Sequence, residues 1–347
     1  MMLDKGQIEN NINWLLAHGS SPVIYLTHKH LLKNDPRSKT MKKLWADVEK
    51  CSAAEDIFSR QEPDGSWFSG GPWSSKPSYI PKHGYSAFTP KYVTTVWILP
   101  MLGDMGFDIQ DKRVKRACEY TLSFQKPKGM FSRFKVDQST QLNRQGFENG
   151  DPANFPCELS VFLQGFGKVG MGKDARLRKS YDLLIRWQRE DGGWVNQKHK
   201  EEQNWTRSCP WVTHHATAAL YHSQIPEYQN PLRKALKFLV RNLSIKKDHE
   251  IQRFYYHGHN MVRELLMFSE TGIGMKEHSV QVVLEWFMSM YYAEESCFRY
   301  QGKPIAKCTR KEAGASSKVL KYRLYHLIED DWFTYYMTRI IANVLNH

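Results

Sequence analysis

Apolar residues recur at three- and four-residue steps along much of the chain, the spacing that places them on one face of an α-helix. In Lys112–Phe124, for example, Val114, Ala117, Cys118 and Leu122 follow this spacing. Similar stretches with one polar face alternate with stretches that are apolar almost throughout. The pattern predicts an all-α chain of six helix pairs. The apolar members are Pro22–Leu32, Thr89–Leu102, Pro152–Gly167, Pro210–Tyr221, Phe254–Phe268 and Lys318–Leu345.

The links between these stretches differ in length according to their direction. Those from an apolar stretch to the next polar-faced one are short and carry stop signals, such as Gly103–Gly106 and Ile225-Pro226. Those in the other direction are mostly long. If the pairs form antiparallel hairpins in a ring, the long loops gather on one face, where a cavity would open.

One short segment repeats along the chain. Gln61–Trp67 and Gln188–Trp194 share the pattern QxxDGxW, and Gln125–Phe131 is a degenerate copy about 63 residues from each. Tyr292–Phe298 is a fainter echo. Each copy follows a polar-faced stretch, so we expect it at the end of an outer helix.

The residue types of this segment suit a structural joint. Its Gly can adopt the left-handed conformation that ends a helix, and its Gln and Asp can hydrogen-bond exposed groups of a neighbouring helix. Its Trp can pack over the seam between hairpins. We therefore expect a structural role for the segment and no catalytic one.

The two intact copies resemble the QW repeats of squalene and oxidosqualene cyclases. Those enzymes share an (α/α) toroid with the β subunits of protein prenyltransferases. The resemblance implies an (α/α)6 toroid of six hairpins, built as a single domain over residues 1–347. It also implies a terpenoid-cyclase-like or prenyl-substrate enzyme that acts on an isoprenoid in an aromatic-lined cavity. Because one fold hosts many activities, the architecture follows more directly than the activity does.

The acid motif of the resembled family is missing. Class II terpene cyclases protonate an alkene with the middle acid of DxDD, which must be buried and protonated. The nearest string is Ile328-Glu-Asp330-Asp331, whose first acid is replaced, and it falls inside the predicted helix Lys318–Leu345. Alternatively, these acids pair with Arg323 or Arg339.

The zinc motif of protein prenyltransferases, an Asp and a Cys two residues apart, is also missing. Cys157 with Glu158, and Cys209 with His214 and His215, supply zinc-ligand types at the starts of two apolar stretches. Free cysteines are more often buried packing. We expect no cofactor, with zinc as the alternative.

Polar and aromatic residues recur near the starts of the apolar stretches, where the cavity is predicted. We expect Glu158, His214, Asp330 and Asp331 to supply acid and base chemistry. Aromatic faces there can stabilise cations or stack on sugars. The alternative is that each is a satisfied core residue. The expected substrate-binding residues are Trp211, His215, Tyr255, Tyr256, His257, His259, Tyr325 and His326.

The net charge of the chain indicates which classes of partner suit it. The net charge of +13 suits a diphosphate-bearing substrate or an anionic membrane surface, or it is only a solvated basic surface. No nucleic-acid-binding motif is present, so a nucleic-acid partner is not expected.

The six cysteines form no CxxC pair, which indicates reduced thiols. With no apolar signal core and no 18-residue apolar window, we expect a cytoplasmic protein, at most peripheral to a membrane.

Two other functions fit the same sequence. One is a carbohydrate-active (α/α)6 enzyme, a glycosidase or lyase, for which Asp151, Glu158, His214 and Tyr255 supply carboxylates and a His/Tyr pair. The other is a non-catalytic, lipid-binding toroid that kept the repeats without the acid.

Overall fold

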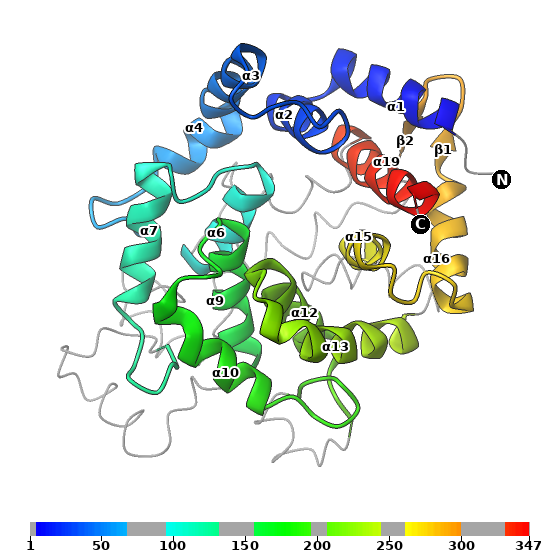
Figure 1. Cartoon of the computed structure of the whole chain (residues 1–347). Helices are drawn as coiled ribbons and strands as arrows, with labels where there is room; N and C mark the ends of the chain where they lie inside the picture. The colour runs from blue at the N-terminus through cyan, green and yellow to red at the C-terminus, as the bar shows by residue number, and fades with distance from the viewer. Residues whose placement is uncertain are drawn as a thin grey trace, which may run out of the picture. The chain divides into compact units, whose positions relative to one another are not determined.

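The computed structural model describes residues 5–67, 95–131, 156–195, 207–243, 261–299 and 330–346 (Figure 1). Most of these residues are in α-helices, and the two strands among them have two residues each. This confirms the all-α fold class. The closed ring of six helix pairs stays a prediction.

The chain divides into two compact units. The first comprises residues 1–57, 239–309 and 316–347, and the second comprises residues 58–238 and 310–315. The single domain over residues 1–347 stays a prediction.

In the first unit, the end of the chain packs against its beginning. The last helix, α19 (Asp330–Asn346), contacts α1 (Lys5–His18), α2 (Ser21–His30) and α15 (Met261–Thr271). The other elements are α3 (Lys39–Glu49), α4 (Ser52–Phe58, whose last residue belongs to the second unit), α16 (His278–Met288), β1 (Tyr291–Tyr292) and β2 (Cys297–Phe298). The two strands pair antiparallel, Tyr291 opposite Phe298.

In the second unit, the helix α9 (Pro156–Lys168) packs against α6 (Thr95–Asp104) and α12 (Pro210–Ser223). All residues of α9 except Lys168 are buried, because its sequence has no continuous polar face. Helices α7 (Lys112–Leu122), α10 (Arg178–Arg186) and α13 (Gln229–Asn242, which continues into the first unit) bury one face and expose charged residues on the other. This is the predicted alternation of polar-faced and apolar helices.

Two helix boundaries differ from the prediction. The stretch Met41–Arg60, predicted as one helix, is divided into α3 and α4 because Lys50 has a ψ of 0° and leaves the helical conformation. The structure places Asp330 and Asp331 in the first turn of α19, whereas the sequence placed them inside Lys318–Leu345. Residues 318–329 lie outside the described residues.

Within the second unit, the QxxDGxW segments contact the outer helix that follows each of them. In each copy, the glutamine side-chain amide donates a hydrogen bond to a backbone carbonyl at or near the start of the following outer helix. The bonds join Gln61 to Arg113 at 2.9 Å, Gln125 to Arg176 at 2.8 Å and Gln188 to Pro231 at 2.9 Å.

The glycine of the third segment brings two backbones into close contact. Gly192 has a φ of +91°, and a Cβ atom added to it would lie 2.4 Å from the Lys234 carbonyl oxygen in α13. Glycine is therefore required here both for its conformation and for lack of space. These contacts confirm the structural role expected for the segment.

In three of the four copies, the echo Tyr292–Phe298 included, the aromatic residue is bonded to the apolar (inner) helix that follows, a contact that the sequence did not predict. Its backbone N–H donates to a threonine hydroxyl near the start of that helix. The pairs are Trp67 with Thr95 at 2.9 Å, Trp194 with Thr213 at 3.0 Å and, in the echo of the first unit, Phe298 with Thr334 at 2.8 Å.

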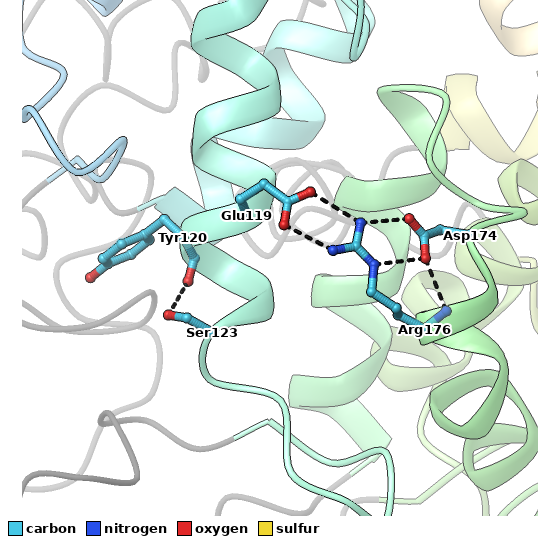
Figure 2. A network of polar contacts seen from close by, with 5 residues as sticks. All are labelled: Glu119, Tyr120, Ser123, Asp174 and Arg176. Atoms are coloured by element: carbon cyan, nitrogen blue, oxygen red, sulfur yellow. Dashed lines mark hydrogen bonds and ion pairs between the residues drawn. The ribbon is translucent and has the colours of Figure 1, made fainter.

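A surface ion-pair network adds a further link between outer helices (Figure 2). The Arg176 guanidinium bonds Glu119 of α7 at 2.8 and 3.0 Å and Asp174 at 2.7 and 2.9 Å. Asp174 also accepts from the Arg176 backbone, capping the short 3-10 turn Ala175–Leu177 that leads into α10. The Arg176 and Glu119 side chains are about half exposed, so their ion pair contributes little to stability.

Candidate functional site

A buried polar and aromatic cluster lies on the three inner helices of the second unit. At its centre is His215 of α12, which is 2% exposed. Its Nδ1 lies 2.7 Å from the Gln164 Oε1 of α9. The imidazole also contacts the rings of Trp97 of α6 and of Trp211 and His214 of its own helix. The His215 imidazole thus contacts polar or aromatic side chains of all three helices, α6, α9 and α12.

The cluster unites three of the residues that the sequence singled out, His214, His215 and Trp211. Trp211 is half-buried, while His214 is only 1% exposed. These positions agree with the expectation of polar and aromatic groups on adjacent inner helices. Their roles stay predictions.

Glu158 is the buried acid of this unit. It lies in the first turn of α9 and is 2% exposed. Gln164 lies six positions further along the same helix, which corresponds to about 9 Å along the helix axis. The carboxyl is thus on the same inner helix as the His215 partner, among side chains that are otherwise mostly apolar.

Two members of the cluster were missed from the sequence. Gln164 and Trp97 lie in apolar stretches, where a single polar or indole side chain reads as core packing. The signal that could have found Gln164 is its amide inside a helix with no exposed face, because a buried amide requires a partner.

The two remaining acid candidates are in the first unit and line a pocket of about 670 Å³. Asp330 and Asp331 border it from the first turn of α19. The other lining residues are Trp14, His18, Glu295 and Arg299. The four predicted catalytic residues thus divide between the units, two in each.

Each acid of this pocket has a structural partner. Asp330 accepts a hydrogen bond from Arg299 Nε at 3.2 Å, and its side chain is 44% exposed. Asp331 Oδ2 accepts from the backbone N–H of Ser20 at 2.9 Å and from its hydroxyl at 2.7 Å, which fixes the residue that precedes α2. The alternative pairing with Arg339 is wrong, since that guanidinium bonds Glu270 instead.

Burial raises the pKa of the Asp330 carboxyl above its ordinary value. The charge and hydrogen bond of Arg299 oppose the rise, and the carboxylates of Asp331 and Glu295 add to it. Because the side chain is nearly half exposed, water can still reach and solvate this acid.

Six of the expected substrate-binding residues lie outside the described residues. They are Tyr255, Tyr256, His257, His259, Tyr325 and His326.

The described part of the chain holds neither a cluster of side chains suited to a metal ion nor a helix suited to spanning a membrane. No group of three or more His, Cys, Asp or Glu side chains is arranged there to hold a metal ion. This holds for Cys157 with Glu158 and for Cys209 with His214 and His215, the residue sets that the sequence offered as zinc ligands. Among the same residues, no helix has the length and apolar character needed to cross a bilayer.

Comparisons with known proteins give weak similarity. No protein-family model matches the chain, and no curated protein matches its sequence. Among solved structures, a protein from Actinoplanes aligns at 12% identity with a TM-score of 0.45, over 98% of this chain and 99% of that one. A type II terpene cyclase from Scytonema, MstE, bound to its substrate geranylgeranyl dihydroxybenzoate, aligns at 12% identity with a TM-score of 0.43, over 98% and 97%. MstE with the product merosterolic acid A aligns at 13% identity with a TM-score of 0.42, over 98% of each chain. At TM-scores this low, the function must be argued from the chain's own residues.

Proposed function

We propose that this chain is a terpenoid-cyclase-like enzyme that acts on an isoprenoid, with Glu158 as the acid that starts the reaction. The observation that carries the proposal is a carboxyl only 2% exposed on an inner helix whose other residues are nearly all buried. The resemblance of Gln61–Trp67 and Gln188–Trp194 to QW repeats supports the same class of enzyme.

Protonation of an alkene requires a carboxylic acid that is shielded from water and held neutral. Glu158 meets the first of these requirements. Asp330 meets it less well, because its side chain is 44% exposed and bonded to the Arg299 guanidinium. We therefore assign the proton donor to Glu158 and a structural role to Asp330 and Asp331.

The reaction proposed is a proton-initiated cyclisation. Glu158 gives its proton to a terminal carbon–carbon double bond, the resulting carbocation is attacked by a second double bond, and a new carbon–carbon bond closes the ring. Loss of a proton from the cyclised cation, with His214 as the proposed base, restores a double bond. The product is then an isomer of the substrate. The ring faces of Trp97 and Trp211 supply the π surfaces that stabilise cationic intermediates.

The net charge supports an anionic partner. We infer that the isoprenoid carries a diphosphate, or that the enzyme meets its substrate at an anionic membrane surface in the cytoplasm.

The test is incubation of the full chain with prenyl diphosphates and with squalene, followed by mass analysis of the products. The proposal predicts a cyclised isomer from at least one of them. The variant Glu158→Gln keeps the shape of the side chain but cannot donate a proton, and should lower turnover by about 10²- to 10⁴-fold. Glu190→Gln, at an exposed position of the same unit, is the matched control and should leave turnover unchanged.

Three outcomes count against the proposal. Tight binding of the isoprenoid with no product indicates a lipid-binding protein. Turnover of an acidic polysaccharide with no isoprenoid product indicates a carbohydrate-active enzyme. Loss of activity in Asp330→Asn with full activity in Glu158→Gln moves the acid to the first unit.

A further inference from the structure

We propose that the first-unit pocket is a second site, independent of the proposed reaction, and that it binds a small organic cation carrying an ammonium group. The pocket is a wide, open depression with a volume of about 670 Å³, enough space for a small molecule that stays partly exposed to solvent. Its walls come from α1, the β1–β2 turn, the residue after β2 and the first turn of α19.

The charge of the walls selects a cation. Among the lining residues that the structure describes, three are carboxylates, Glu295, Asp330 and Asp331, and one is a guanidinium, that of Arg299. Glu295 and Asp330 share that guanidinium, which lies 2.8 Å from Glu295 Oε1 and 3.2 Å from Asp330 Oδ2. These described lining residues therefore carry excess negative charge, within a chain whose net charge is +13.

The Asp331 carboxylate contributes negative charge that the described donors of its hydrogen bonds do not neutralise. Its carboxylate accepts hydrogen bonds from the backbone and hydroxyl of Ser20 and from the backbone of Trp332, all of which are neutral donors. Neutral donors orient a carboxylate without cancelling its charge. A positively charged ligand in the pocket would face this carboxylate and the shared pair beside it.

The aromatic wall favours an organic cation. Trp14 and His18 are one turn apart on α1, and their rings lie 5.3 Å apart between centroids. An indole face attracts ammonium groups. His18 is also the last residue of α1, where the partial negative charge of a helix C-terminus adds to the attraction.

Other ligand classes fit less well. Three carboxylates would repel a phosphate or carboxylate ligand. The described residues, these six included, hold no arrangement of three or more side chains suited to a metal ion. The combination of acids and indole thus points to an amine or a quaternary ammonium compound.

Fluorine NMR of the full chain labelled with 5-fluorotryptophan tests this directly. The Trp14 signal, one of 11 tryptophan signals, is assigned by its loss in Trp14→Phe. We expect tetraethylammonium chloride to shift that signal in a saturable way, whereas sodium chloride and sodium sulfate at equal ionic strength do not. A Trp14 signal that stays unmoved by tetraethylammonium, or that moves equally with sodium chloride, would overturn the proposal.

Substitution of the carboxylates tests which of them attract the cation. Asp330→Asn and Glu295→Gln should each weaken binding by about three- to fivefold, since each removes one half-exposed negative charge from the wall. Glu295→Gln is the safer variant for folding, because its half-exposed side chain lies in a turn. Glu294→Gln, exposed next to it but outside the pocket, is the matched control and should bind within about twofold of the native chain. Equal affinity in Glu295→Gln and Glu294→Gln would contradict the assignment, whatever the outcome of the isoprenoid assays.

Discussion

Replacing Gly192 with alanine tests whether the QxxDGxW segment holds two outer helices together. The φ of +91° costs an L-residue about 1–2 kcal/mol. The added Cβ would also lie 2.4 Å from the Lys234 carbonyl oxygen, a distance that real Cβ atoms essentially never show. Because that oxygen belongs to the backbone of α13, the helix must shift away. We expect a total loss of about 3–5 kcal/mol in the free energy of unfolding.

Gly170 offers a matched control in the same unit. It has a φ of +82°, but a Cβ added to it would meet only the Asp108 Cβ, at 3.8 Å, which is an ordinary contact. Gly170→Ala should therefore cost only the conformational part, about 1–2 kcal/mol. The difference between the two variants isolates the contact with α13.

The assay is urea unfolding followed by circular dichroism and by tryptophan fluorescence, with the thermal midpoint as a second measure. If the chain unfolds in one step, each kcal/mol corresponds to roughly 1–2 °C at this length. Non-coincident curves from the two probes would show that the units unfold separately, and the comparison then uses the transition that the mutation moves. Equal losses for Gly192→Ala and Gly170→Ala would refute the argument that the segment depends on close contact with the next helix.

Three further predictions concern stability. Thr213→Val should cost about 1–3 kcal/mol in urea unfolding, because it leaves the buried Trp194 N–H without its acceptor, and Thr213→Ser should recover most of this. Arg176→Ala should cost less than about 1 kcal/mol, with a smaller effect in 1 M salt, since the Arg176 side chain is half exposed; a large, salt-independent loss would contradict this. For Asp111, burial alone would raise the carboxyl pKa, but the hydrogen bonds and charge of Arg113 outweigh it and hold the pKa below 3.8. Its contribution is then complete above pH 3.8 and lost as the pH falls through the lowered pKa, so Asp111→Asn should flatten the acid limb of a stability–pH curve.

The sequence predicted the type and order of helices well because burial of one face leaves a periodic signal. The prediction Lys112–Phe124 differs from α7 only by two residues at its end, and Pro210–Tyr221 matches α12 to within the same margin. The same signal cannot detect a local change of ψ, such as the one at Lys50 that separates α3 from α4. Periodicity reports which residues are buried and leaves the exact ends of helices undetermined.

The sequence indicated which residue types would lie in the site, but it did not indicate which residues they would bond to. His214, His215 and Glu158 stood out because ionisable groups are unusual in apolar stretches, and all three are buried. The partner of His215, Gln164, is 51 residues away in sequence, and a single chain carries no signal that pairs them. The same reason explains why the sequence did not offer Arg299, which the structure pairs with Asp330; Arg323, one of the two partners it did offer, lies outside the described residues.

The most direct test of the central claim is the isotope content of the product when the reaction is run in D₂O. If Glu158 exchanges its acid proton with solvent before giving it to the alkene, each product molecule gains one deuterium on carbon, and its mass is one unit higher than in H₂O. The account predicts this increase for the native chain and loss of the product in Glu158→Gln. An isoprenoid product that forms without deuterium, or that forms equally well in Glu158→Gln, would contradict proton-initiated cyclisation by this residue.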